Sequence, residues 1–320
     1  MAGIQIIGTG SAVPEKILSN DDMSTWLDTS DEWIYKRTGI KRRHIAAEGE
    51  GSHDLAIRAA RQALERAKEA DSGFSKEKLI AVITASMSSD YICPTVSCII
   101  QEELSLPEDI TAYDINAACT GFVYALQNAF RILKEDKDGY VLIVGSECMS
   151  RLVDYNDRSV CVLFGDGAGA AVLRFDPSDE SMFLPIAGTK GSQKILYCRK
   201  PPVSDGFLHM NGQEVYRFAS NSLRTAIERL LERSGLSIED IDQVVCHQAN
   251  ARIIDSVRRR FPGAEDKFYQ HMEEYANTSG ASVALVMNEM FQKGILHENM
   301  TIICAAFGAG LSWNAVLMTI

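Results

Sequence analysis

The same order of segments occurs twice along this chain of 320 residues. The run Cys119-Thr-Gly-Phe-Val-Tyr-Ala-Leu126 shares Gly, Ala and Leu, in one register, with the run Thr278-Ser-Gly-Ala-Ser-Val-Ala-Leu285. Each run predicts a helix, and an apolar, β-branched segment that predicts a strand follows it, at 140–144 and 301–304. This repetition predicts that the chain folds as two copies of one α/β unit.

Two further kinds of segment keep the same order in both parts. Residues 54–66 and 222–233 have the apolar spacing of a helix. A predicted strand follows each of them, at 79–84 and at 243–246. A glycine-rich segment closes each series, at 164–173 and 307–317. We therefore predict a duplicated α/β fold with halves 1–174 and 175–320, each a mixed sheet between helices. The active site is expected where the halves meet.

Composition and charge exclude several classes of protein. Hydrophobic residues make up 46% of the chain and charged residues 23%, as in ordinary globular enzymes. The formal net charge of −11 argues against wholesale binding to nucleic acid or to an anionic membrane, because the long-range field repels both. No run approaches the roughly 18 apolar residues that a membrane span requires.

The eight cysteines are scattered, without a CxxC pair or a Cys/His spacing typical of a metal site. We therefore expect no metal, and reduced thiols as in a cytoplasmic protein. The first ten residues lack a basic segment followed by a long apolar core, so they predict a first strand rather than a signal peptide. The expected location is the cytoplasm.

One cysteine, Cys119, stands where an apolar, β-branched segment ends and a predicted helix begins. A thiol there lies over the positive end of the helix dipole, which favours the thiolate. His247 and Asn277 follow far downstream. A cysteine with a distant histidine and asparagine can form a nucleophile whose oxyanion or carbanion is held by polar donors. The alternative is an inert core cysteine, the commoner state of a lone cysteine among apolar residues.

Eight motifs in one order carry a resemblance to a known family. They include Ile7-Gly-Thr-Gly-Ser-Ala-Val-Pro14, Ala117-Ala-Cys-Thr-Gly-Phe122 and His247-Gln-Ala-Asn250, with the others at 28–33, 37–40, 164–169, 277–280 and 306–310. On these residues the chain resembles the β-ketoacyl-acyl-carrier-protein synthase III family of the thiolase fold along nearly its whole length. The resemblance implies an α/β, thiolase-like fold in αβαβα layers, two duplicated halves with a mixed five-stranded sheet each, and a homodimer.

The resemblance also implies a reaction. A short acyl group would pass from acyl-CoA to Cys119, CoA would leave, and the acyl group would condense with malonyl-acyl-carrier protein as carbon dioxide departs. Backbone N–H groups of Cys119 and Ala309 would hold the oxyanion, and position 309 is usually glycine in the family. His247 and Asn277 would donate hydrogen bonds to the enolate. No cofactor is implied, since acyl-CoA is a substrate.

The resemblance assigns the binding residues as well. Trp33 and Arg158 would sandwich the adenine of CoA, with Arg37 and Thr38 nearby and Asn250 on the pantetheine arm. Tyr216 stands where the family more often has phenylalanine. The acidic carrier protein would dock on four arginines, Arg217, Arg252, Arg259 and Arg260. Otherwise the basic run at 252–260 is a solvated surface without a partner.

Several alternatives stay open. A related condensing acyltransferase of secondary metabolism would use the same three residues on a different acceptor. A cysteine hydrolase and a catalytically inactive binding protein are two further classes. Cys93 stands where a loop of the family usually has phenylalanine beside the acyl pocket, so the acyl primer is left undetermined.

Overall fold

The computed structural model describes residues 3–176, 182–199 and 205–320. Its first large sheet has the strand order β1-β7-β6-β4-β5. The strands are β1 (Gly3–Ala12), β4 (Leu79–Ala85), β5 (Thr111–Ile115), β6 (Tyr140–Cys148) and β7 (Asp166–Asp176). The helices that belong to this half are α3 (Ser52–Ala70), α4 (Val96–Glu103) and α5 (Gly121–Glu135).

The second large sheet has the order β11-β12-β13-β8. The strands are β8 (Phe183–Ser192), β11 (Gln243–Cys246), β12 (Thr301–Gly308) and β13 (Gly310–Thr319). The helices of this half are α6 (Gly212–Ser234), α7 (Ala251–Arg258), α8 (Met272–Tyr275) and α9 (Ser282–Gln292). Shorter elements flank the site: α1 (Asn20–Ser24), α2 (Asp31–Thr38), and the hairpins of β2 (Ile17–Ser19) with β3 (Arg42–His44) and β9 (Leu196–Cys198) with β10 (Leu208–Met210).

The strand pairings confirm the predicted duplication. In the first sheet β4 runs parallel to β6, whereas β6–β7 and β7–β1 are antiparallel. In the second sheet β11 runs parallel to β12, whereas β12–β13 and β13–β8 are antiparallel. The two sheets therefore share the strand order and the strand directions. The boundary between residues 174 and 175 stays a proposal; β7 ends at Asp176.

The expectation of five strands in each sheet is wrong for the second half, whose described residues form a sheet of four. The segment at the place of β5 is Tyr269–His271, between α7 and the turn that carries Asn277. The side chain of Gln248 holds this segment, because its Nε2 donates to Tyr269 O at 3.2 Å and its Oε1 accepts from His271 N at 3.1 Å. The Gln248 side chain thus takes up two backbone groups, Tyr269 O and His271 N, that a strand would offer to its neighbour in a sheet.

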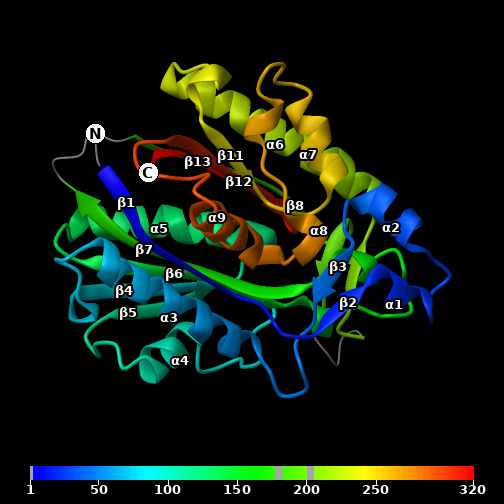
Figure 1. Ribbon diagram of the computed structural model, residues 1–320, viewed down its shortest axis with the longest axis horizontal. Coiled ribbons are helices and arrows are strands. Elements are labelled where there is room, and N and C mark those ends of the chain that lie inside the picture. Colours follow the sequence, from blue (N-terminus) through cyan, green and yellow to red (C-terminus); the bar gives the residue numbers. More distant parts are fainter. Residues whose placement is uncertain (1–2, 177–181, 200–204) are drawn as a thin grey trace.

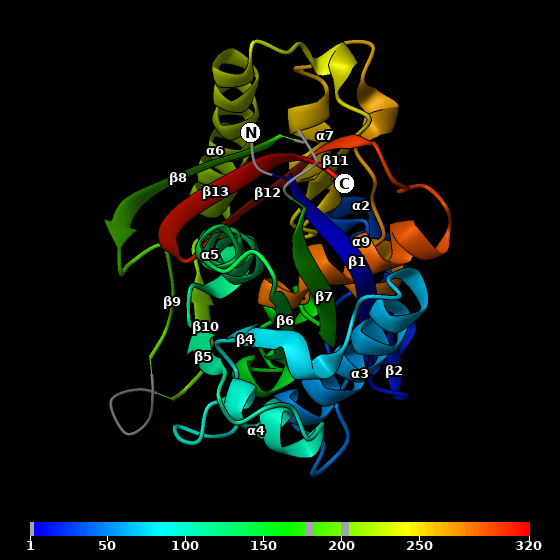
Figure 2. The same cartoon turned by 90° about the vertical axis from the view of Figure 1, so that its left-hand side faces the viewer.

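The elements stack in five layers, as the resemblance implied (Figures 1 and 2). Helices α5 and α9 lie between the two sheets and form one apolar core with both. Alternate side chains of a strand face opposite layers, so Ile83 belongs to this central core and Val82 to the outer core under α3 and α4. Helices α6 and α7 cover the outer face of the second sheet. No helix among the described residues is long and apolar enough to cross a membrane.

A strained turn precedes each central helix. Ala118 and Ser279 have positive φ angles of 46° and 48°, in the short 3₁₀ turns Ala118–Thr120 and Ser279–Ala281. Tyr140 and Thr301, where β6 and β12 begin, keep the same spacing of 161 positions as these two residues. The sequence match that paired Gly121 with Gly280 used a spacing of 159 positions, two fewer than the spacing in the structure. With the structural spacing of 161, Cys119 corresponds to Gly280.

Candidate active site

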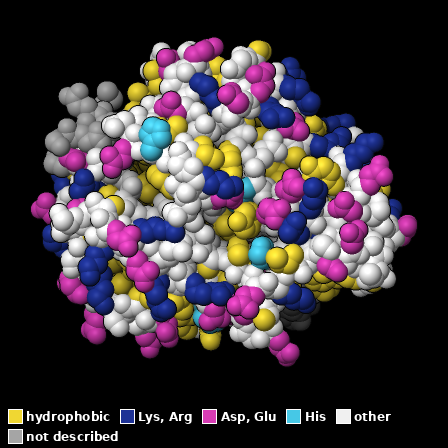
Figure 3. Space-filling model, viewed as in Figure 1, with side chains coloured by type: hydrophobic (Ala, Val, Ile, Leu, Met, Phe, Trp, Pro, Cys, Tyr) yellow, Lys and Arg dark blue, Asp and Glu magenta, His cyan; other side chains and the backbone are white. Residues whose placement is uncertain are grey.

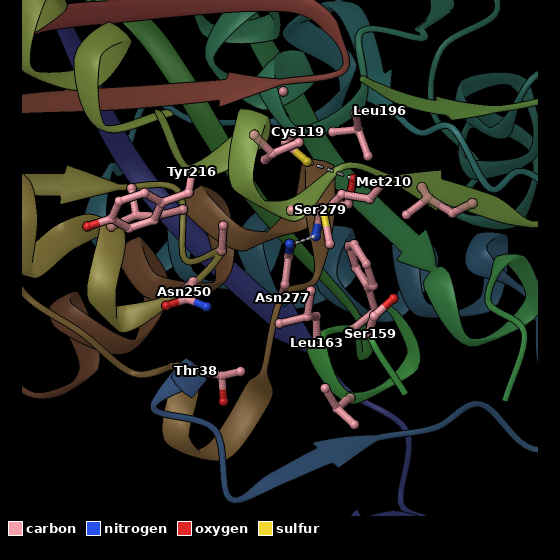
Figure 4. A pocket seen from close by; sticks show the side chains of 18 of the residues that line it. Thr38, Cys119, Ser159, Leu163, Leu196, Met210, Tyr216, Asn250, Asn277 and Ser279 are labelled. Atoms are coloured by element: carbon pink, nitrogen blue, oxygen red, sulfur yellow. Dashed lines mark hydrogen bonds between the residues drawn. The ribbon is translucent and has the colours of Figure 1, made fainter. Parts of the chain in front are cut away.

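A cavity of about 460 Å³ lies where the two halves meet, and Cys119, His247 and Asn277 all line it. Cys119 lies in the turn before α5, His247 follows β11, and Asn277 lies between α8 and the turn before α9. The fold therefore brings Cys119 together with two residues, His247 and Asn277, that lie more than 100 positions after it in the chain. Figure 4 shows Cys119 and Asn277 around Ser279, with Leu196 and Met210 beside them among the residues that line the cavity.

The Cys119 thiol is neutral in this site. Burial raises its pKa to about 12, and the hydrogen bond of 3.4 Å between Sγ and Ser279 Oγ only partly opposes that rise. The position before α5 favours the thiolate, as expected, but a helix terminus contributes at most about 2 kcal/mol, or roughly 1.5 pKa units. The predicted preference for thiolate is therefore outweighed by burial, and the thiol loses its proton as it reacts.

His247 is a neutral hydrogen-bond donor. Its ring is buried, and burial lowers its pKa to about 3. Its Nδ1 lies 2.5 Å from Ser282 Oγ, which also accepts a bond of 3.3 Å from the backbone N–H of Gln248. The serine proton is therefore directed to Nδ1, and the ring proton sits on Nε2. Among the described residues no group pairs with Nε2, so this N–H is left to the cavity that the ring lines.

Asn277 is fixed by both halves of the chain. Its backbone N–H donates to Leu163 O at 2.9 Å, and its carbonyl accepts from Gly165 N at 3.1 Å. Its side-chain Oδ1 accepts from Ser279 N at 2.8 Å. A backbone N–H can only donate, so this contact orients the amide and leaves the Nδ2 donor for the cavity.

The turn between β12 and β13 approaches the back of Cys119. A Cβ on Gly308 would lie 3.0 Å from Cys119 N and 3.1 Å from Cys119 Cβ, so only glycine allows this approach. The next residue, Ala309, lines the cavity with Gly308. The backbone of the predicted oxyanion residues, Cys119 and Ala309, therefore lies at one end of the cavity.

The mouth of the cavity carries an aromatic ring between cations. The guanidinium carbon of Arg37 lies 4.2 Å, and that of Arg158 5.1 Å, from the centroid of the Trp33 ring. Arg158 also donates to the backbone carbonyl and the carboxylate of Asp28. A ring stacked between Trp33 and Arg158 needs about 7 Å, two contacts of about 3.5 Å. Arg158 therefore has to move for the predicted sandwich to form.

The remaining predicted CoA residues line the same cavity, but two have polar groups already in use. The Thr38 hydroxyl donates to Ile34 O at 2.7 Å and accepts from Ile40 N at 3.0 Å. The Asn250 amide accepts from Arg252 N at 2.9 Å and donates to Arg37 O at 3.0 Å. Tyr216, by contrast, is exposed at the mouth. Figure 4 shows these three side chains on the side of the cavity away from Leu196 and Met210.

The four predicted docking arginines are exposed on neighbouring helices. Arg217 lies on α6, and Arg252 begins α7 and lines the cavity mouth. Arg259 caps α7 at its C-terminal end, and Arg260 follows it. Figure 3 shows Lys and Arg side chains gathered along the upper right edge of the molecule, where Figure 1 places α7 and α2.

Several site residues escaped the sequence analysis. Ser279 and Ser282 lie in a run that was used as a repeat and, in part, as a family motif, without a role for either serine, although they bond the Cys119 sulfur and the His247 ring. Glu147 and Met87, behind and beside the thiol, carry no sequence signal at all. Cys93 is exposed and does not line the cavity of its own chain. The described residues contain no group of three or more His, Cys, Asp or Glu side chains placed to hold a metal.

Comparison with known proteins gives one consistent picture. Residues 113–191 match the family described as 3-oxoacyl-[acyl-carrier-protein (ACP)] synthase III, and residues 231–320 match its C-terminal counterpart. The chain is 40% identical to the β-ketoacyl-[acyl-carrier-protein] synthase III of Clostridium acetobutylicum, with 99% of each chain covered. The crystal structure of 3-oxoacyl-[acyl-carrier-protein] synthase III from Aquifex aeolicus superposes with a TM-score of 0.92 at 37% identity, covering 99% of this chain and 100% of that one. The priming β-ketosynthase of the R1128 polyketide pathway is also similar, at 33% identity and a TM-score of 0.91, with 99% and 96% covered.

Proposed function

The chain belongs to the 3-oxoacyl-[acyl-carrier-protein] synthase III family of condensing acyltransferases, and we propose how its residues perform the family's reaction. The substrates are acyl-CoA and malonyl-acyl-carrier protein, and the product is a 3-oxoacyl-carrier-protein thioester that starts fatty-acid synthesis. One observation supports this above all. The half-buried Cys119 thiol shares a single cavity with two neutral donors, His247 Nε2 and Asn277 Nδ2, that no described group occupies.

In the first half-reaction the Cys119 sulfur attacks the thioester carbonyl of acyl-CoA. The new carbon–sulfur bond forms, the carbonyl oxygen becomes an oxyanion, and the backbone N–H groups of Cys119 and Ala309 hold it. Such a donor typically contributes about 3 kcal/mol. The oxyanion then collapses, the bond to the CoA sulfur breaks, and the departing CoA carries away the proton that Cys119 gives up.

In the second half-reaction malonyl on the carrier protein loses its carboxylate as carbon dioxide. The electron pair of the broken carbon–carbon bond forms an enolate, and His247 Nε2–H and Asn277 Nδ2–H donate to its oxygen. Neither group has to remove a proton, which agrees with a histidine whose pKa lies near 3 and an amide that does not titrate. The enolate carbon attacks the acyl group, and Cys119 leaves as the thiolate and regains a proton.

The two substrates reach Cys119 through the same mouth. Trp33 stacks on the adenine of CoA once Arg158 has moved, and Arg37 faces its phosphates. Thr38 and Asn250 shape the wall of the passage for the pantetheine arm. The Asn250 amide donates to Arg37 O and so holds the end of α2 against α7, whereas the Thr38 hydroxyl bonds within and just after α2. Leu196 and Met210, beyond the sulfur, are apolar walls for the acyl chain.

The acidic carrier protein docks on Arg217, Arg252, Arg259 and Arg260. Arg252 lines the cavity, and the other three arginines are exposed on α6 and at the C-terminal end of α7. In a chain whose net charge is −11, these cations provide a local field of the opposite sign. We further propose that the protein acts as a homodimer in the cytoplasm. Light scattering of the purified protein and fractionation of cells that express it test these two statements.

The second candidate is a condensing acyltransferase of secondary metabolism, favoured by the likeness to the R1128 priming ketosynthase. That enzyme is 33% identical to this chain, whereas the Clostridium synthase is 40% identical. The acceptor distinguishes the two functions. We expect condensation with malonyl on a fatty-acid carrier protein, and turnover only with a different carrier protein or acceptor would support the second candidate.

The deciding experiment measures the intact mass of the protein after incubation with a panel of acyl-CoAs. We expect the gain of one acyl group in the wild type and none in Cys119→Ala, and the chain length that loads best identifies the primer. Cys246→Ala is the matched control, since Cys246 is a buried cysteine that does not line the cavity. An adduct that survives in Cys119→Ala, or no adduct with any donor, would refute the proposal.

A further inference from the structure

The carboxyl group of Glu147 lies fully buried near the end of β6, and the mechanism above does not use it. Among the ion pairs of the described residues, none involves this side chain. A buried carboxyl without a cation is costly unless hydrogen bonds satisfy it, and such groups concentrate at functional sites. Its negative charge acts on Cys119, whose pKa it helps to raise.

Hydrogen bonds from two other segments converge on this carboxyl. Oε2 accepts from the backbone N–H groups of Met87 and Ser88, both at 3.1 Å, and from the hydroxyl of Ser88. The Ser86 hydroxyl lies 3.5 Å from the same oxygen. Oε1 accepts from Gly280 N at 3.2 Å. The side chain thus ties β6 to the loop that follows β4 and to the turn that precedes α9.

The donor set requires the carboxyl to act as an acceptor. The three backbone N–H groups can only donate. Ser88 Oγ already accepts from Cys148 N at 2.8 Å, which directs its proton to Glu147. These bonds favour the carboxylate, whereas burial favours the acid and leaves the pKa of Glu147 raised to about 7. The nearest titratable groups that feel its charge are the thiols of Cys119 and Cys148.

One of the segments that Glu147 holds contacts the reacting sulfur, and the other contacts the hydroxyl that bonds that sulfur. Ser279, next to Gly280, lies 3.4 Å from Cys119 Sγ through its hydroxyl. Met87 Sδ lies 3.7 Å from that hydroxyl, and Met87 lines the cavity. A Cβ on Gly280 would lie 2.9 Å from Glu147 Oε1, so the glycine is needed for this close contact.

We propose that Glu147 is a positioning residue for acyl transfer, which clamps Met87 and the Ser279–Gly280 turn in place around the Cys119 thiol. This inference rests on the proposed function, because the positioned thiol is the one that accepts the acyl group. The charge of Glu147 opposes thiolate formation, so its contribution to the reaction is geometric. Charge and geometry therefore predict opposite effects when the carboxylate is replaced by an amide.

The test compares Glu147→Gln, Glu147→Asp and Asp166→Asn with the wild type. Asp166 is the matched control: it is a buried carboxylate on β7 that accepts from Ala46 N at 2.7 Å and Ser150 N at 2.8 Å, without lining the cavity. The measurements are single-turnover acylation at saturating acyl-CoA, the acyl-CoA concentration for half-maximal rate, and alkylation of Cys119 by iodoacetamide. Ser88→Ala, which removes the hydroxyl donor to Glu147 and the acceptor of Cys148 N, serves if Glu147→Gln does not fold.

In Glu147→Gln we expect the rate of acylation at saturating acyl-CoA to fall about 10- to 100-fold. The amide NH2 group would replace one acceptor oxygen and would face a backbone N–H donor, so that donor would lose its hydrogen bond. The half-saturating acyl-CoA concentration should stay within about twofold, since the mouth is untouched, and Glu147→Asp should recover part of the rate. Alkylation by the small reagent should not fall, because removal of a negative charge lowers the pKa of Cys119. Ser88→Ala should lower saturated acylation by a smaller factor.

Two results would overturn the inference while the wild type is acylated normally. One is acylation at the wild-type rate in Glu147→Gln, or in Ser88→Ala if Glu147→Gln does not fold. The other is an equal loss in Asp166→Asn, which would indicate a general effect of unfolding. Failure of the wild type to accept any acyl group would refute the proposed function and this inference together.

Discussion

Replacement of Ser282 by alanine tests how His247 is set up for the condensation step. The hydroxyl of Ser282 lies 2.5 Å from His247 Nδ1 and accepts from Gln248 N, so its removal leaves two buried polar groups without a partner. The ring is then free to place its proton on either nitrogen, and Nε2 is no longer held as a donor.

The expected size of the effect follows from these two lost contacts. An unsatisfied buried donor or acceptor costs about 1–3 kcal/mol. If that cost falls on the enolate contact, condensation slows by about 5- to 150-fold. The first half-reaction does not use His247, so acylation of Cys119 by acyl-CoA should remain within about twofold of the wild type.

The assay separates the two half-reactions. Enzyme that is first loaded with an acyl group is mixed with malonyl-acyl-carrier protein, and release of carbon dioxide and product is followed in one turnover. Ser97→Ala is the matched control, because Ser97 is a buried serine with bonds to Thr84 and Tyr113 away from the cavity. Condensation at the wild-type rate in Ser282→Ala would refute the role assigned to this hydroxyl.

The remaining predictions concern acid stability, the cavity mouth, the docking surface and the oxyanion turn. Burial lowers the pKa of His247 from 6.5 to about 3, so between these two pH values the unfolded state binds a proton that the folded state does not. The free energy of unfolding, measured by urea titration, should therefore fall as the pH drops from 6.5 toward 3. Its dependence on pH should be weaker in His247→Gln. Trp33→Ala should raise the half-saturating acyl-CoA concentration about tenfold, with little change in saturated acylation measured by intact mass. Arg259→Glu should lower kcat/KM for malonyl-carrier protein but not for malonyl-CoA, and a loss independent of salt would contradict electrostatic docking. Gly308→Ala should slow acylation at least about tenfold, because its Cβ would press on Cys119; a normal rate would show that the turn yields.

The duplicated fold was predictable because burial periodicity is written in the sequence. The helices and strands expected at 54–66, 140–144 and 301–304 are α3, β6 and β12. The fifth strand of the second sheet was not predictable. The backbone of Tyr269 and His271 is instead bound by the side chain of Gln248, more than 20 positions away. A local pattern does not report such a contact.

The candidate site divides in the same way. Cys119, His247 and Asn277 could be named from residue type and motif, and the structure brings them to one cavity. Ser282 and Glu147 could not be named, since their importance comes from partners that only the fold supplies. Each partner lies at least 34 positions away in the chain.

The sequence by itself determined the two-fold repetition and the order of helices and strands, and it named the residues that we propose as the nucleophile and its two donors. These follow from local properties, namely apolar periodicity, the chemistry of each side chain and short motifs. Only the tertiary structure decided that Cys119 and His247 are neutral, which ring nitrogen of His247 donates, and which end of the Asn277 amide is free. Protonation and hydrogen-bond direction depend on burial and on partners from distant segments, and both exist only once the two halves have packed together.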